Sequence, residues 1–245
     1  MKPKSESLFH FTRNVSSLKG ILEHGFAPRF CLEDVHWIYT GTDHFVAYPM
    51  VCFCDIPLSR IDEHTAFYGS YGLGMTKRWA LLNSLSPVFY SPVDSPQVEL
   101  AKFLLREWSG TPDEPEEALE RKHLVNAHFY NLLTRIKPLS GKMMVGGGLT
   151  EKDFYQESEW RYVPPGPSIL QQANFATERD KANETMLDRT LRFSPADVRY
   201  ILVKEDHEIP DLVDFIMTKL GTFSHNELKV LQTRIFSLQS LSLDL

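Results

Sequence analysis

The run Met50-Val51-Cys52-Phe53-Cys54, closed by Asp55-Ile56-Pro57, is the stretch that decides the fold of this 245-residue chain. Five consecutive apolar residues are typical of a buried strand, and the Asp-Ile-Pro segment breaks that strand before a helix begins. We therefore expect a core that contains at least one buried strand with a helix following it.

Segments on both sides of this run add strands and helices without regular alternation. The predicted strands are residues 8–11, 87–90, 142–145, 159–163 and 200–203, with an edge strand at 234–238. The predicted helices cover about 16–24, 59–68, 77–82, a segment that begins at Ser95-Pro96, 112–136 and 211–220. This mixture predicts an α+β fold, with one domain over residues 1–245 and a helical insertion at about 95–140.

Three segments are not assigned to a strand or a helix. Residues 26–49 carry turn formers and aromatic residues, which indicates a loop long enough to form a lid. Residues 68–74 contain three glycines, which predicts a tight irregular connection because glycine adopts positive φ at no steric cost. Residues 171–190 are polar and are expected to form a surface excursion.

Composition places the chain among ordinary globular proteins, with 42% apolar, 12% aromatic and 24% charged residues. No segment has the apolar length of a signal peptide or a membrane span, so a cytoplasmic protein without membrane contact is expected. Three cysteines in a long chain argue against a disulfide framework. The formal net charge of −6 disfavours a general nucleic-acid-binding surface.

Several site types have no motif in this sequence. The chain has no G-x-S-x-G elbow, no G-x-x-x-x-G-K-[ST] loop and no H-E-x-x-H helix. The Gly146–Gly148 triplet has no following lysine, so a turn explains it better than a phosphate cradle. A zinc site built from Cys52, Cys54 and nearby histidines is disfavoured, because a C-x-C pair in an apolar strand is typical of core residues.

Three polar elements stand at or near predicted strand ends. The first is His10-x-Thr12, the second is Ser59 with His64, Tyr68 and Tyr71, and the third is Glu157-x-Glu159. Each alone has a structural explanation as a helix cap, a half-buried aromatic residue or a solvated strand face. Together they match a known pattern.

A wider set of segments carries a family resemblance: Leu8-Phe9-His10-Phe11-Thr12, Leu18 to Gly25-Phe26, Cys52 to Leu58, Tyr68 to Lys77, Ser86 to Tyr90 and Phe154 to Pro164. With these segments the chain resembles the AbiGi type of bacterial abortive-infection proteins. These segments lie in the first two-thirds of the chain, and the insertion at 95–140 is the least characteristic part. The resemblance implies a role in phage resistance, with a toxin or antitoxin protein as a partner.

A second resemblance concerns chemistry. The order of the three polar elements is similar to the ADP-ribosyltransferase fold, which implies a split mixed or antiparallel sheet with helical insertions. The resemblance implies an NAD site, with cofactor-binding roles for His10, Phe11, Thr12, Ser59, Tyr68 and Tyr71. It also implies Glu159 as the catalytic carboxylate, with Glu157 engaging a macromolecular acceptor and His10 assisting. Arg13 and Arg29 are the arginines nearest to the first strand.

Breaking a nicotinamide–ribose bond develops positive charge on the sugar, which a nearby carboxylate stabilises. The transferase hypothesis therefore gives Glu159 a role in rate rather than in binding. The alternative is a non-enzymatic antitoxin that neutralises a partner toxin. A repressor that binds DNA is disfavoured by the negative net charge of the chain and by the absence of a clear helix-turn-helix.

Overall fold

The computed structural model describes residues 5–39, 44–108, 116–145 and 148–243. The strands are β1 (Ser7–Thr12), β2 (Arg29–Asp34), β3 (Phe45–Cys54), β4 (Tyr71–Thr76), β5 (Ser86–Pro87), β6 (Phe89–Ser91), β7 (Ile136–Pro138), β8 (Ser140–Val145), β9 (Gly148–Asp153), β10 (Glu159–Tyr162), β11 (Leu170–Gln171), β12 (Val198–Val203) and β13 (Ile235–Ser237). The α-helices are α1 (Val15–His24), α2 (Ile61–Tyr68), α3 (Lys77–Leu82), α4 (Pro96–Trp108), α5 (Glu116–Leu133), α6 (Gln172–Glu184), α7 (Ile209–Lys219), α8 (His225–Gln232) and α9 (Leu238–Leu241). Short 3-10 helices include η1 (Leu58–Arg60) and η2 (Phe154–Glu157).

The main sheet is mixed and is organised around the long strand β3. Its strands follow the order β13-β12-β4-β1-β3-β10-β5, and β2 and β11 also pair with β3. Only β12 and β13 run parallel within it. Near Cys54, β3 pairs with β1 and β10, whereas its residues 45–50 pair with β2 and residues 46–47 with β11. β3 therefore joins two groups of strands. One group contains β1 and β10, and the other contains β2 and β11.

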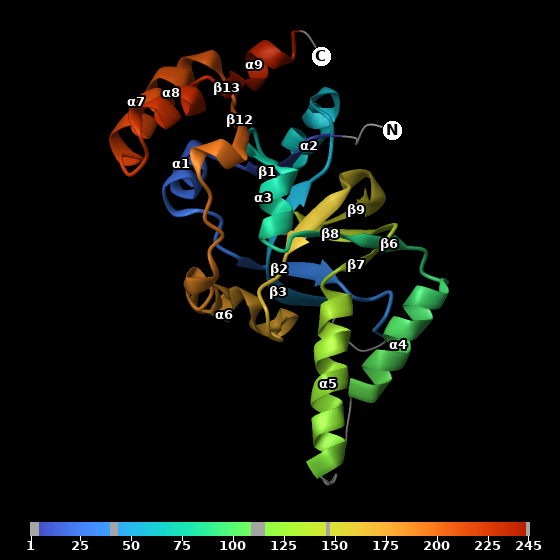
Figure 1. Cartoon of the computed structure of the whole chain (residues 1–245). Coiled ribbons are helices and arrows are strands. Elements are labelled where there is room, and N and C mark those ends of the chain that lie inside the picture. The colour runs from blue at the N-terminus through green and yellow to red at the C-terminus, as the bar shows by residue number, and fades with distance from the viewer. Residues whose placement is uncertain (1–4, 40–43, 109–115, 146–147, 244–245) are drawn as a thin grey trace.

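Helices cover both faces of the β1 half of the sheet. On one face, α1, α3, α7 and α8 contribute to the largest apolar cluster together with Leu8, Phe53 and Ile201 of the strands. On the other face, Ile61 of α2 and residues of α9 pack near Phe9. Figure 1 shows α7, α8 and α9 gathered at one end of the molecule, away from α4 and α5.

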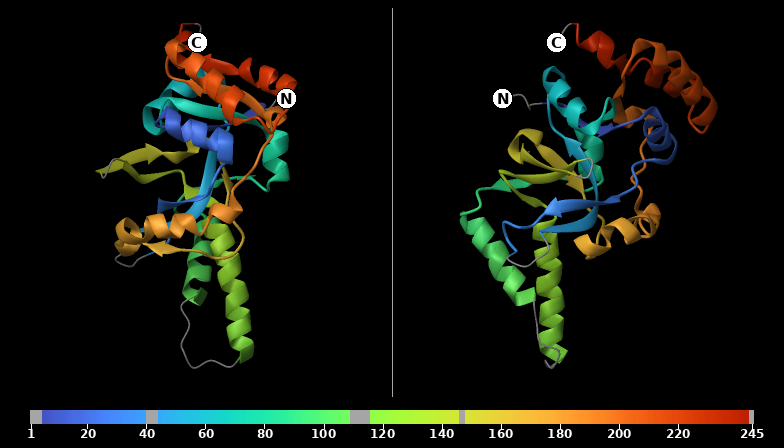
Figure 2. Two further views of the ribbon diagram at one scale, coloured as in Figure 1. Left: turned by 90° about the vertical axis from the view of Figure 1, so that its left-hand side faces the viewer. Right: turned by 180° about the vertical axis from the view of Figure 1, so that it is seen from behind.

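The helices α4 and α5 form a hairpin that projects from the body, as the views in Figures 1 and 2 agree. Val98 and Ala101 of α4 pack against Phe129 and Leu133 of α5, and the base of the hairpin contacts Val35 and Ile38. The predicted insertion at 95–140 thus contains these two helices. Of the described helices, none is long and apolar enough to cross a membrane.

Two expectations about irregular segments were wrong. Residues 26–49 contain β2 and the start of β3, because an edge strand with only one partner needs no strict apolar alternation. Residues 71–76 form the central strand β4 between β1 and β12. The glycines there allow close packing, since a Cβ at Gly74 would lie 2.8 Å from the Phe9 ring. The polar stretch 171–190 does lie largely on the surface, where residues 172–184 form the mostly exposed helix α6 against β2 and β3.

Most of the residues predicted to begin or end a helix were correct. Gly25 and Gly69 follow the last residues of α1 and α2, Pro96 begins α4, and the Thr76 side chain caps α3 by accepting from the Trp79 amide at 3.2 Å. Ser59 was wrongly predicted to begin α2. It lies in η1, and no side chain caps the start of α2. The predicted edge strand is β13, which stands at the end of the sheet order.

Candidate functional site

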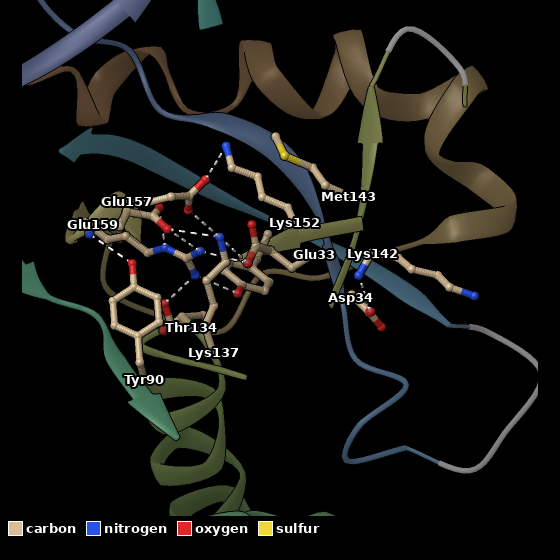
Figure 3. A network of polar contacts seen from close by, with 12 residues as sticks. Glu33, Asp34, Tyr90, Thr134, Lys137, Lys142, Met143, Lys152, Glu157 and Glu159 are labelled. Carbon is tan, nitrogen blue, oxygen red and sulfur yellow. Dashed lines mark hydrogen bonds and ion pairs between the residues drawn. The ribbon is translucent and has the colours of Figure 1, made fainter. Parts of the chain in front are cut away.

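A cavity of about 580 Å³ opens where β3 joins the two groups of strands. Its walls come from β1, β2, β3, the C-terminal half of α2, the β7 and β8 strands, η2 and α6. This volume lies within the range of small-molecule sites in proteins. Figure 3 shows the network of polar contacts to which Glu157 and Glu159 of its lining belong.

Glu159 is fixed at the floor of the cavity by cations from two strands. Its Oε1 accepts a hydrogen bond from Arg161 Nε at 2.7 Å, and its Oε2 accepts from Lys137 Nζ at 3.0 Å. Glu159 and Arg161 are two residues apart on β10, so both side chains lie on the same face of the strand. Both side chains are buried, and Arg161 is fully so.

Arg161 also binds the other walls of the site. Its guanidinium donates to Glu33 Oε2 at 2.7 Å, to the Tyr48 hydroxyl at 3.0 Å and to the Thr134 carbonyl at 3.0 Å. These bonds join β10 to β2, β3 and the end of α5. Arg161 is therefore the central cation of the network.

Glu157 forms a second cluster on the α2 side. It accepts hydrogen bonds from the Tyr68 hydroxyl and from Lys137 Nζ, the latter at 3.3 Å, and Lys152 Nζ lies 2.8 Å from its Oε1. Lys152 also donates to the Tyr68 hydroxyl at 2.8 Å and lies over the Tyr68 ring. Lys137 contacts both glutamates and joins the two clusters (Figure 3).

Glu157 does not share a strand face with Glu159, contrary to the expectation from their spacing. Glu157 ends η2, and Ser158 follows in the left-handed conformation with φ 46°. The two glutamates therefore lie on either side of a turn and do not belong to one continuous strand. They still converge because Lys137 attracts both of them.

The network balances its own charge. Three carboxylates, of Glu33, Glu157 and Glu159, meet three cations, of Lys137, Lys152 and Arg161. Burial by itself raises the pKa of Glu159, but Arg161 and Lys137 outweigh it and hold that pKa well below its usual range. The pKa of Glu157 is lowered in the same sense, because Lys137 and Lys152 outweigh its burial. Both carboxylates are therefore ionised at neutral pH.

The pKa of Tyr68 is shifted in the opposite direction from the pKa values of the two glutamates. Burial and the adjacent Glu157 carboxylate raise the pKa of Tyr68 well above its usual value. The hydroxyl thus stays protonated and donates to Glu157. A neutral, oriented tyrosine beside two carboxylates can hold a ligand group but does not act as a base at neutral pH.

The structure brings some predicted residues to the cavity and leaves others outside it. Phe11, His10, Tyr68, Glu157 and Glu159 line it. The ring of His10, however, contacts Phe26 and Phe53, and its Nδ1 lies 2.8 Å from the Cys52 carbonyl oxygen. Strand alternation puts this side chain on the Leu8 face of β1, so it points away from the glutamates. Burial lowers its pKa.

Thr12, Ser59 and Tyr71 do not line the cavity. The Thr12 hydroxyl bonds within its own turn, to the Asn14 backbone. Ser59 is exposed in η1, and the Tyr71 hydroxyl donates to Glu208 Oε1 at 2.6 Å. Of the two tyrosines with an expected stacking role, only Tyr68 thus lies at the site. Arg13 lines the cavity, and Arg29 does not.

Lys137, Arg161, Glu33 and Lys152 were not among the predicted site residues. Arg161 carried a signal, because Glu159 and Arg161 alternate with the apolar Trp160 and Tyr162 along one strand. Lys137, Glu33 and Lys152 carried none, since no motif of the sequence links them to Glu159. Glu33 reaches the site because β2 and β10 both pair with β3, whereas Lys137 and Lys152 come from β7 and β9, which lie outside the main sheet.

The cysteines and histidines do not assemble a metal centre. Among the described residues, no group of three or more His, Cys, Asp or Glu side chains is placed to hold a metal ion. Cys52 and Cys54 both line the cavity as free thiols. Burial raises the pKa of each, so both remain protonated. Residues 146 and 147 of the glycine triplet lie outside the described residues, and Gly148 begins β9.

Comparison with known proteins gives one family and one relative. The model of the family described as "Putative abortive phage resistance protein AbiGi, antitoxin" matches residues 24–204. The chain is 26% identical over 223 residues to an abortive phage resistance protein AbiGi of Lactococcus lactis subsp. cremoris, covering 79% of this chain and 88% of that protein. No solved structure matches the chain.

Proposed function

Because this chain belongs to the AbiGi family of abortive phage resistance proteins, we propose that it acts as an antitoxin that binds a partner toxin protein. The family match, which extends over residues 24–204, carries the proposal. The family description names an antitoxin, and the antitoxin role proposed for this chain is direct binding of the toxin protein. A surface on this molecule must then be available to a partner.

The projecting α4–α5 hairpin supports this proposal. Large apolar side chains stand exposed on it, with Leu100 at 53%, Phe103 at 50% and Leu124 at 59% of their surface accessible. Leu100 and Phe103 are three residues apart on α4 and so lie on one face of that helix. Exposed apolar residues grouped on a projecting element are typical of protein contact surfaces.

The buried charge network supports a binding role as well. Both carboxylates at the cavity floor are neutralised by internal cations, as expected for groups that hold strands together. A catalytic carboxylate would instead need a free oxygen toward its substrate.

The proposal can be tested by co-expression with a candidate toxin, taken as the product of the adjacent gene. The antitoxin should co-purify with that toxin and relieve its inhibition of growth. The double variant Leu100→Asp/Phe103→Asp should lose both effects and remain folded. The matched control Leu81→Asp/Leu82→Asp changes two exposed leucines of α3 and should keep both. A toxin that neither co-purifies with nor is relieved by the wild-type protein would contradict the antitoxin role.

A second candidate function is NAD-dependent transfer of ADP-ribose to a macromolecular acceptor. It is favoured by the cavity, which brings Tyr68, Glu157 and Glu159 together beside a space of suitable size for a dinucleotide part. Tyr68 would stack on the nicotinamide ring, and Glu159 would stabilise positive charge on the ribose.

NAD turnover by the purified protein tests this candidate. Glu157→Gln should reduce turnover while the change in melting temperature produced by NAD persists, because the Tyr68 ring remains in place. His10→Ala serves as a contrast, since its ring points toward Phe26 and its loss should act through packing. Absence of turnover and of any NAD-induced shift would remove the candidate.

A further inference from the structure

The cavity carries a set of cations that the internal network does not use. Arg13 follows β1, Lys142 lies on β8 and Arg179 lies on α6, and all three line the cavity with exposed side chains. None of the three forms an ion pair with another described residue. Figure 3 shows the Lys142 side chain directed away from the Glu33–Glu159 network.

Together with the network, this set gives the cavity an excess of positive charge. The lining itself holds four cationic side chains and the four carboxylates of Glu33, Asp34, Glu157 and Glu159, and the excess comes from Lys152 and Arg161, which contact the floor from behind the lining. Asp34 is occupied by backbone amides, since it accepts from His36 N at 2.9 Å and Lys142 N at 3.2 Å. The excess stands out on a chain whose formal net charge is −6. A cavity of this sign attracts an anion.

Aromatic side chains are a second feature of the cavity lining. Phe9, Phe11, Tyr68, Phe154 and Phe175 belong to the cavity wall. Phe9 and Phe11 lie with ring planes 16° apart, and the Arg179 guanidinium lies 5.1 Å from the Phe175 ring centroid. A flat ring system could pack against such walls, with a neighbouring guanidinium adding cation–π attraction.

We propose that the cavity binds a nucleotide, with its phosphates on Arg13, Lys142 and Arg179 and its base against the aromatic wall. Arginine forms bidentate bonds to phosphate oxygens, and a lysine adds a point charge. Exposed rim cations suit phosphates, which remain partly hydrated, and the apolar interior suits a base. The inference shares its cavity with the NAD candidate, but it requires neither a nicotinamide group nor any bond cleavage.

Isothermal titration calorimetry with ADP tests the proposal. Adenosine and inorganic pyrophosphate are titrated separately, because they represent the two parts of ADP. The variants Arg13→Gln, Lys142→Gln and Arg179→Gln each remove one rim cation. The matched control is Arg199→Gln, an exposed arginine of β12 outside the cavity. Each rim variant should weaken ADP binding about tenfold, because each removes one charge-assisted contact. Arg199→Gln should bind ADP as the wild type does, and adenosine should bind all variants equally.

Equal ADP affinity in the wild type and the three rim variants would overturn the proposal, as would absence of ADP binding at millimolar concentration. The rim side chains are exposed, so an unchanged melting temperature without ligand shows that each variant is folded. The result is independent of the functions proposed above. ADP binding without NAD turnover would retain this inference and remove the transferase candidate, and loss of toxin binding would leave it unaffected.

Discussion

Glu159→Gln provides a direct test of the role of the charge network. The change keeps the shape of the side chain and removes one of three buried carboxylates, leaving Lys137, Lys152 and Arg161 against Glu33 and Glu157. Arg161 Nε loses its charged acceptor at 2.7 Å, and Lys137 loses one at 3.0 Å. Removing one partner of a buried ion pair costs about 3–5 kcal/mol, because the other charge remains buried and unpaired.

We therefore expect the free energy of unfolding to fall by about 3–5 kcal/mol. For a chain of this length, each kcal/mol lowers Tm by about 2–4 °C, so a decrease of roughly 6–20 °C should follow. Urea unfolding followed by circular dichroism gives the free energy, and calorimetry gives Tm.

A second substitution separates lost charge from lost shape. Lys137→Met in the Glu159→Gln background removes the cation that is then in excess, so the two carboxylates of Glu33 and Glu157 again face two cations. The double variant should be more stable than the sum of the single changes predicts, by roughly 1–3 kcal/mol of coupling. A cost below about 1 kcal/mol for Glu159→Gln, with no coupling, would refute the structural role of Glu159. A loss of NAD turnover at unchanged stability would instead favour the transferase candidate.

Three further predictions concern backbone, protonation and thiol reactivity. Gly69→Ala should destabilise the protein by more than about 2 kcal/mol, because φ is +113° and a Cβ would lie 2.3 Å from a backbone oxygen; Gly166→Ala, with φ +93° and open space, should cost only about 1 kcal/mol in the same urea assay. Burial lowers the pKa of His10, so the unfolded state binds a proton first; the free energy of unfolding should decline as pH falls below about 6.5, more steeply than in His10→Gln, and equal slopes would contradict this. Cys54 is buried with a raised pKa and should react with a thiol reagent only as fast as the protein opens; reaction at the rate of an exposed thiol would show that the β3 end is accessible.

Local signals in the sequence predicted many element boundaries. Gly25, Gly69 and Pro96 act through their own backbone geometry, and Thr76 acts through an amide three residues away, so neighbouring residues suffice to identify them. The apolar run 50–54 likewise lies in the strand β3, since a continuous apolar segment requires burial on both faces.

Pairing between distant strands could not be predicted in the same way. The segment 71–76 was expected to be irregular because of its glycines, yet it is the strand between β1 and β12. The glycines there make room for the rings of Phe9 and Tyr200, which come from other strands. Tertiary packing therefore outweighed the low intrinsic strand propensity of the glycines.

The residues of the candidate site show the same difference between local and long-range signals. The sequence by itself determined the family and identified Tyr68, Glu157 and Glu159, because these residues lie in motifs whose members are close in the chain. Only the tertiary structure decided which other residues join them. Arg161 and Glu33 meet because β10 and β2 both pair with β3, and Lys137 joins them from β7 of a separate small sheet, whereas strand alternation turns the His10 ring to the opposite face. Burial then requires each charge in the site to have a partner, and that requirement acts through space rather than along the chain.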